Sequence, residues 1–279
     1  MAFQFIRLFS DSFKAVWRNK RLWLLHFLGN AAILTGAVLW LKIPDASAWQ
    51  LLFATVAALV LVAAALWLHA GTSAYFLAAQ GTGEGSLSTG FKTGRRHLFA
   101  FALWSAIFAV LICLALHLAG KATDTDAFAS WLRSIMPAFL RRSISLDTVD
   151  SVVNWAINLV LYVLIPALLL PFAVQFAGHG LSAFGSTLKA WRQTVGRFSY
   201  WAWFCVLALL GIYLPSLITH WAPDLSSLIL ENLSMAVRFA LAFAFAVTAW
   251  LMLTSMLGRL GGGAGAGKGG EGAGSNAPA

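Results

Sequence analysis

Residues Leu51–Ala70 are LLFATVAALVLVAAALWLHA, a stretch without Lys, Arg, Asp or Glu. The hydrocarbon core of a bilayer is about 30 Å thick, and a helix needs roughly 20 apolar residues to cross it. Helix is the expected conformation because an open sheet leaves backbone groups without hydrogen-bond partners in lipid. The sequence stays weakly apolar as far as Ala79, so we expect this helix to extend beyond the membrane.

Five further stretches have the same character, and the sequence therefore predicts an all-α integral membrane protein with six transmembrane helices. Of the 279 residues, 60% are hydrophobic and only 10% are charged, whereas a soluble domain carries about 25% charged residues. The predicted spans are approximately Leu22–Leu41, Leu51–Ala70, Leu98–Leu118, Val152–Phe176, Ser199–Thr219 and Leu233–Leu257.

The charged residues predict how the chain is oriented. Six spans place both ends of the chain on one side, where the flanking segments hold 13 Lys and Arg residues against six on the other side. The positive-inside rule assigns the side rich in Lys and Arg to the cytoplasm. We therefore expect a multi-pass protein of the bacterial inner (plasma) membrane with cytoplasmic N and C termini.

Three basic segments on the predicted cytoplasmic side resemble one another. Phe13-Lys14, Phe91-Lys92 and Leu188-Lys189 each pair an apolar residue with Lys, and each is followed by Arg and then directly by a span. This pattern suggests three repeated units of an amphipathic segment plus a helix pair; the alternative is three independent basic flanks that serve only the topology. Their cations are candidates for contact with anionic lipid headgroups. The candidates are Arg7, Lys14, Arg18, Lys20, Arg21, Lys92, Arg95, Arg96, Lys189, Arg192 and Arg197.

Two amphipathic helices are expected beside the membrane domain of residues 22–260. In residues 1–21, apolar residues recur at helical spacing away from a basic face, which is typical of a helix in the headgroup plane; alternatively its apolar face packs on the bundle. Residues near 127–142, in an outer loop, predict a second interfacial helix, bent or interrupted at Pro137. Alternatively this second helix docks a partner or caps the bundle. Residues 261–279 are Gly-rich and predict a disordered cytoplasmic tail.

Polar residues inside the spans are few. No Asp, Glu or Lys lies near a span centre, which argues against an ion-coupled transporter. The exceptions, towards the outer side, are Asn154 and Asn158 in the fourth span and Glu231 and Arg238 around the sixth. We expect Arg238 to extend towards Glu231 or the headgroups. The alternatives are an anion site shared with the two asparagines and hydrogen bonding between helices.

No catalytic residue, metal site or cofactor is predicted. Cys113 and Cys205 lie in apolar runs and are expected to be core residues, and the six histidines form no close pair at ligand spacing. In the fourth span, Pro166 and Pro171 should each remove a backbone hydrogen bond and bend the helix. The net charge of +9 is distributed around the spans, so anionic lipid is a better partner than nucleic acid.

Two segments carry a resemblance to a known group of proteins. They are Ser12-Phe-Lys-Ala-Val-Trp-Arg-Asn-Lys-Arg-Leu22 and Gly90-Phe-Lys-Thr-Gly-Arg-Arg96. Together with six spans, they resemble the uncharacterised six-span bacterial membrane domains of the kind appended to some glycerophosphodiester phosphodiesterases. The resemblance implies a role in lipid or envelope physiology. It implies no hydrolase activity, because the sequence contains no phosphodiesterase domain.

The sequence therefore predicts a non-enzymatic inner-membrane protein that acts as a lipid-contacting scaffold or as an accessory subunit of a membrane complex. Its expected partners are membrane lipids with anionic headgroups and other membrane subunits. The alternative is a transporter or permease subunit with a polar site on the outer side of spans four and six.

Overall fold

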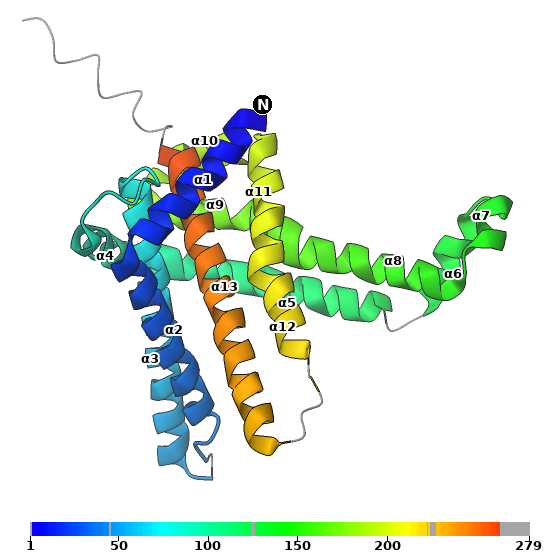
Figure 1. Cartoon of the computed structure of the whole chain (residues 1–279), viewed down its shortest axis with the longest axis horizontal. Coiled ribbons are helices and arrows are strands. Elements are labelled where there is room, and N and C mark those ends of the chain that lie inside the picture. The colour runs from blue at the N-terminus through cyan, green and yellow to red at the C-terminus, as the bar shows by residue number, and fades with distance from the viewer. Residues whose placement is uncertain (1, 45, 124–125, 222, 224–226, 263–279) are drawn as a thin grey trace, which may run out of the picture. The chain divides into compact units, whose positions relative to one another are not determined.

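The computed structural model describes residues 2–44, 46–123, 126–221, 223 and 227–262 (Figure 1). Every element in this part of the chain is helical, and six helices in it are long and apolar enough to cross a membrane. They are Lys20–Trp40, Ala48–Ala78, Leu98–Leu118, Leu146–His179, Phe198–His220 and Leu228–Gly261. The chain is thus an all-α membrane protein, as predicted.

Short helices precede the pairs of spans. The elements are α1 (Ala2–Arg18), α2 (Lys20–Trp40), α3 (Ala48–Ala78), α4 (Leu87–Arg96), α5 (Leu98–Thr123), α6 (Asp126–Ile135), α7 (Ala138–Ser143), α8 (Leu146–Leu159), η1 (Val160–Leu164), α9 (Ile165–His179), η2 (Leu181–Ala183), α10 (Phe184–Val195), α11 (Phe198–Ala208), η3 (Leu209–Tyr213), α12 (Leu214–His220) and α13 (Leu228–Gly262). Helices α1, α4 and α10 each lead directly into a span. This order agrees with the predicted units of one short helix and two spans.

Two predicted boundaries need correction, at the end of the first helix and at the start of the tail. The first helix ends at Arg18 rather than at residue 21, because Asn19 leaves the helical conformation and its side chain accepts a hydrogen bond from the Leu22 amide at 3.1 Å. Such a cap satisfies an amide that the first turn of a helix leaves free. The outer stretch forms two helices, α6 and α7, and Pro137 lies between them, so the predicted interruption is confirmed. Helix α13 continues to Gly262, so the first two residues of the tail predicted for 261–279 are helical, and the rest of that tail lies outside the described residues.

The fourth and fifth spans each contain one turn of π-helix ahead of a proline. The amide of Ile165 donates to the carbonyl of Val160, just before Pro166, and the amide of Leu214 donates to that of Leu209, just before Pro215. Proline lacks an N–H and crowds the preceding turn, and the wider π turn accommodates both effects. Pro171 lies inside α9, which continues to His179.

The chain divides into two compact units. The main unit contains Met1–Ala102 and Pro171–Ala279, and the smaller unit contains Leu103–Leu170. In the main unit the buried residues gather near the C-terminal ends of α3, α9 and α13. The largest fully buried side chains there include Tyr75, Phe76, Phe176, Leu251 and Met256.

In the smaller unit, α6 packs on α8. Ala129 of α6 is buried with Val149 and Val153 of α8, whereas Trp131 and Phe139 are 55% and 70% exposed. The apolar face predicted for the outer stretch is therefore divided, because one part packs within the protein and the other part stays open.

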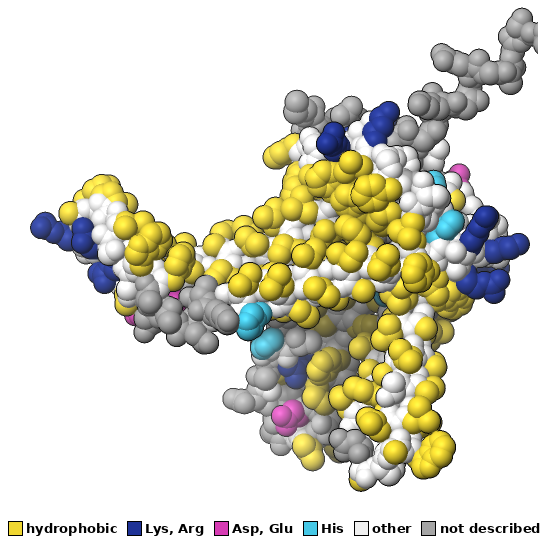
Figure 2. All heavy atoms as spheres, turned by 180° about the vertical axis from the view of Figure 1, so that it is seen from behind, with side chains coloured by type: hydrophobic (Ala, Val, Ile, Leu, Met, Phe, Trp, Pro, Cys, Tyr) yellow, Lys and Arg dark blue, Asp and Glu magenta, His cyan; other side chains and the backbone are white. Residues whose placement is uncertain are grey.

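Apolar side chains are exposed along the spans. Figure 2 shows them covering much of the visible surface of the long helices, and examples are Leu59 and Val110, at 64% and 65% exposure. Such a surface suits lipid rather than water. Cys113 and Cys205 are free thiols on this exposed surface, so the expectation that they are core residues is wrong.

Candidate lipid-contacting surface

The three short helices of the main unit pack inward through small residues. The buried residues are Ser12, Ala15 and Val16 in α1, Gly90 and Gly94 in α4, and Thr187, Ala190 and Thr194 in α10. Spacings of three and four residues place each set on one helical face. The basic residues fall elsewhere, and all eleven cations predicted to contact lipid are exposed. We call the exposed cations of α1, α4 and α10, with Lys20, Arg21 and Arg197, the basic surface.

The same register occurs in each short helix. A buried small residue lies two positions before the Lys of each apolar–Lys pair. The pairs of buried residue and lysine are Ser12 and Lys14, Gly90 and Lys92, and Thr187 and Lys189. The three short helices therefore share a pattern of buried residues as well as the sequence pattern from which the repeat was predicted.

Helix α4 lies backbone to backbone against α3. A Cβ atom added to Gly94 would be 2.6 Å from the amide nitrogen of Gly71, and one added to Gly90 would be 2.5 Å from the Cβ of Tyr75. Only glycine permits such a close approach at these two positions. The opposite side of α4 therefore carries Lys92, Arg95 and Arg96 outward.

Helix α1 contacts the bundle with part of its apolar surface. Val16 is buried, and the ring of Phe9 stacks on Trp203 with 4.1 Å between centroids. Ile6 and Trp17 are 63% and 64% exposed. The alternative that the apolar face packs on the bundle thus holds in part, whereas a position in the headgroup plane stays a prediction.

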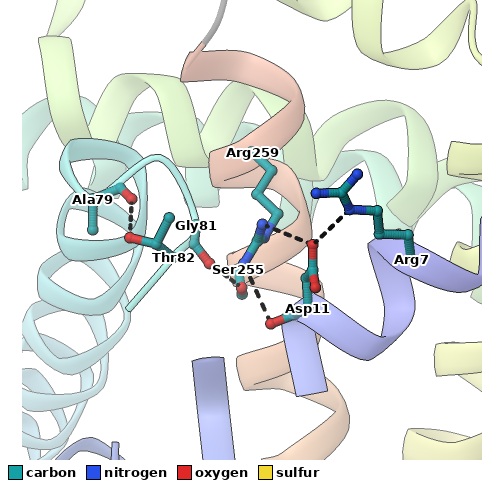
Figure 3. Close-up of polar contacts among 7 residues, drawn as sticks. All are labelled: Arg7, Asp11, Ala79, Gly81, Thr82, Ser255 and Arg259. Carbon is teal, nitrogen blue, oxygen red and sulfur yellow. Dashed lines mark hydrogen bonds and ion pairs between the residues drawn. The ribbon is translucent and has the colours of Figure 1, made fainter. Parts of the chain in front are cut away.

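An ionic contact joins α1 to α13 (Figure 3). Arg259 donates from Nη2 to the carbonyl oxygen of Asp11 at 3.3 Å, and its Nη1 lies 3.6 Å from the Asp11 carboxylate. Arg7 lies on the other side of that carboxylate, at 3.9 Å. One turn before Arg259, Ser255 donates to the carbonyl of Gly81 at 2.7 Å. Helix α13 therefore holds both α1 and the loop between α3 and α4.

The end of α1, the start of α2, the α3–α4 loop and Arg259 of α13 line an open hollow of about 870 Å³, which we call the basic groove. Its charged lining consists of Lys14, Arg18, Lys20, Arg21, Arg259, Asp11 and Glu84. Cations thus outnumber carboxylates five to two, and Asp11 already has cationic partners. Sequence reasoning named four of these cations but did not place them around one hollow.

His97, between α4 and α5, has a shifted pKa. Burial lowers the pKa of His97 below its ordinary value of 6.5, and the charges of Arg96 and His179 lower it further. The neutral imidazole is therefore favoured in the folded protein.

Two of the four polar residues predicted near the outer side, Asn154 and Arg238, have local partners. In the smaller unit, the Asn154 amide donates to Asp150 at 3.0 Å, and Asn158 is exposed. In the main unit, Arg238 donates to the carbonyls of Thr219 and Trp221, at the end of α12, whereas Glu231 is exposed. Arg238 thus makes the hydrogen bonds between helices that were one of its three alternatives. The site that would combine Arg238 with the asparagines stays a prediction.

A buried polar cluster was missed by sequence reasoning. His26 of α2 lies 2.5 Å from the hydroxyl of Thr72 in α3, Asn30 donates to the His26 carbonyl at 2.9 Å, and the ring centroid of His69 lies 5.5 Å from that of His26. The spacing of His26 with Asn30, and of His69 with Thr72, puts each pair on one helical face, which was an available signal. Within the described part of the chain, no three His, Cys, Asp or Glu residues are grouped so that they could hold a metal ion.

Comparison with protein families, curated proteins and solved structures found no match for this chain. The resemblance to the six-span domains appended to some phosphodiesterases therefore stays a prediction.

Proposed function

We propose that the protein is a non-enzymatic, lipid-contacting scaffold or accessory subunit of a bacterial inner membrane. In this proposal the basic surface lies on the cytoplasmic leaflet and attracts anionic headgroups. The observation that supports it is that all eleven predicted cations are exposed, beside spans with open apolar surfaces. Each Lys or Arg near an anionic leaflet contributes roughly 1 kcal/mol of attraction.

The exposed apolar residues of α1 add to this argument. Ile6, Phe13 and Trp17 are exposed on a helix that also carries Lys14 and Arg18. A helix with aromatic and basic residues of this kind is suited to the boundary between headgroups and acyl chains. The proposed contact therefore combines electrostatic attraction with burial of apolar side chains.

The experiment measures lipid preference in the reconstituted full chain. Spin-labelled phosphatidylglycerol and phosphatidylcholine are compared for the fraction immobilised at the protein surface. The test variant neutralises two cations on each short helix and carries Lys14→Gln, Arg18→Gln, Lys92→Gln, Arg95→Gln, Lys189→Gln and Arg192→Gln. We expect its preference for the anionic lipid to fall several-fold.

The matched control exchanges Lys for Arg and Arg for Lys at the same six positions. It keeps every charge, so its lipid preference should equal that of the natural sequence. An unchanged preference in the neutralised variant would contradict the proposal.

A second candidate function is a transport subunit, favoured by the π turns ahead of Pro166 and Pro215, because such turns are frequent at functional sites. An aqueous path would have to expose Asn158 to water. In a background with Cys113→Ser and Cys205→Ser, Asn158→Cys should then react with a membrane-impermeant maleimide. Val152→Cys on the same helix is the control, and equal labelling of both positions, or none of either, would count against transport.

A further inference from the structure

We propose that the basic groove is a specific binding site for a phosphate group, carried by an anionic lipid headgroup or by a soluble phosphate. This proposal rests on the proposed function and deepens it, because it assigns one hollow of the basic surface to a defined ligand chemistry. A general attraction of lipid requires only exposed charge. A site also requires cations that converge, that are free to bind and that are held in position.

The groove brings together cations from three elements. Lys14 and Arg18 end α1, Lys20 and Arg21 begin α2, and Arg259 approaches from α13. The single non-helical residue between α1 and α2 turns the chain, so that both helix ends contribute to one lining. Guanidinium and ammonium groups are the side chains that recognise phosphate, through charge-assisted hydrogen bonds.

Four of these five cations are available to a ligand. Among the described residues, Lys14, Arg18, Lys20 and Arg21 form no ion pair, and all four are exposed. The carboxylate of Asp11 lies near Arg7 and Arg259 and therefore offsets mainly the charge of those two guanidinium groups. The remaining carboxylate in the lining is that of Glu84.

A chain of hydrogen bonds fixes the walls of the groove. The Asn19 side chain donates to the hydroxyl of Tyr75 at 2.7 Å, and that hydroxyl donates to the carbonyl of Gly83 in the α3–α4 loop. The Tyr75 side chain of α3 therefore holds both Asn19, the residue between α1 and α2, and the α3–α4 loop. A site that is already ordered loses less entropy when it binds its ligand.

The loop is also held from its other side. Gly81 has a φ of +71°, and a Cβ atom there would lie 2.2 Å from the carbonyl of Ser255. The Ser255 hydroxyl donates a hydrogen bond to the Gly81 carbonyl (Figure 3). Helix α13 therefore holds the loop in place and also carries Arg259 to the groove. The hollow of about 870 Å³ is large enough for a phosphorylated headgroup.

The experiment measures binding of dihexanoyl phosphatidic acid, a soluble short-chain lipid, to the full-length protein in a neutral detergent. The groove variant carries Arg18→Gln and Arg21→Gln. The matched control carries Lys189→Gln and Arg192→Gln on α10, which removes the same charge from outside the groove. We expect the groove variant to bind about tenfold more weakly or worse, corresponding to about 1.4 kcal/mol or more, and the control to change far less.

The outcomes separate the site from the general surface. Equal weakening of both variants would overturn the groove and leave the proposed function standing, whereas no weakening of the groove variant would overturn the groove outright. Unfolding temperatures of both variants are compared with that of the natural sequence. If the groove variant does not fold, Lys14→Gln with Lys20→Gln replaces it.

A competition arm identifies the source of the phosphate. Inorganic phosphate is titrated against sodium chloride at equal ionic strength. Displacement of the lipid by phosphate but not by chloride supports a groove that accepts soluble phosphate. Displacement by neither salt, with binding that still depends on Arg18 and Arg21, supports a groove that requires the lipid. Equal displacement by both salts indicates charge screening and would overturn the site.

Discussion

The contact between α3 and α4 provides a sharp test of how the basic surface is held. In Gly94→Ala, the new Cβ atom would lie 2.6 Å from the Gly71 nitrogen and 2.7 Å from the Ala70 carbonyl carbon. Ordinary van der Waals contact begins near 3.4 Å. Both atoms belong to the backbone of α3 and cannot rotate away, so α4 has to move outward.

The size of the effect follows from two opposing contributions. Overpacking of a close contact costs typically about 1–3 kcal/mol, whereas replacing Gly by Ala in a helix gains up to about 1 kcal/mol. We therefore expect Gly94→Ala to lower the free energy of unfolding by roughly 1–2 kcal/mol. Gly185→Ala in α10 is the control, because its Cβ meets nothing within 4 Å. The control should be neutral or slightly stabilising.

The assay is equilibrium unfolding of both variants in mixed micelles of dodecyl maltoside and sodium dodecyl sulfate, followed by circular dichroism. The comparison removes effects of the micelle that are common to both proteins. The reasoning would be refuted if Gly94→Ala and Gly185→Ala had the same stability. Helix α4 would then not lie backbone to backbone on α3.

Three further predictions concern the same end of the main unit. Tyr75→Phe removes the hydroxyl that joins Asn19, between α1 and α2, to the α3–α4 loop. It should lower the free energy of unfolding by about 1–3 kcal/mol. An unchanged free energy of unfolding would contradict these hydrogen bonds. A double-mutant cycle with Asp11→Asn and Arg259→Gln should give a coupling of about 0.5–1 kcal/mol in unfolding experiments, and a coupling of zero would contradict the contact. Because the folded state lowers the pKa of His97, the unfolded chain binds more protons as pH falls through 6.5. The unfolding temperature should therefore decrease modestly below pH 6.5, and His97→Gln should reduce that decrease. If the unfolding temperature of His97→Gln fell with pH as steeply as that of the natural sequence, the lowered pKa of His97 would be contradicted.

The sequence alone was sufficient for the fold class and for the spans. Uncharged stretches such as Leu51–Ala70 can satisfy their backbone in lipid only as helices, so their length and composition specify the element without knowledge of any neighbour. The break at Pro137 could also be predicted from one residue, because proline has no amide hydrogen to donate inside a helix. The exposure of Lys14, Lys92 and Lys189 also followed, since an unpaired charge is costly to bury.

Tertiary structure decided which of these residues meet. Nothing in the spacing of Lys14 and Arg259, far apart in the chain, indicates that they line one groove. The same holds for His26 and Thr72, which form a buried contact between two spans that the sequence analysis did not pair. It holds too for Arg238, which bonds to carbonyls at the end of α12 and not to Glu231 on its own helix. The physical reason is that the apolar pattern of a segment shows only that its helix is buried in lipid or protein. The face that the helix turns towards its neighbours, and which neighbours these are, depend on close packing at residues such as Gly94.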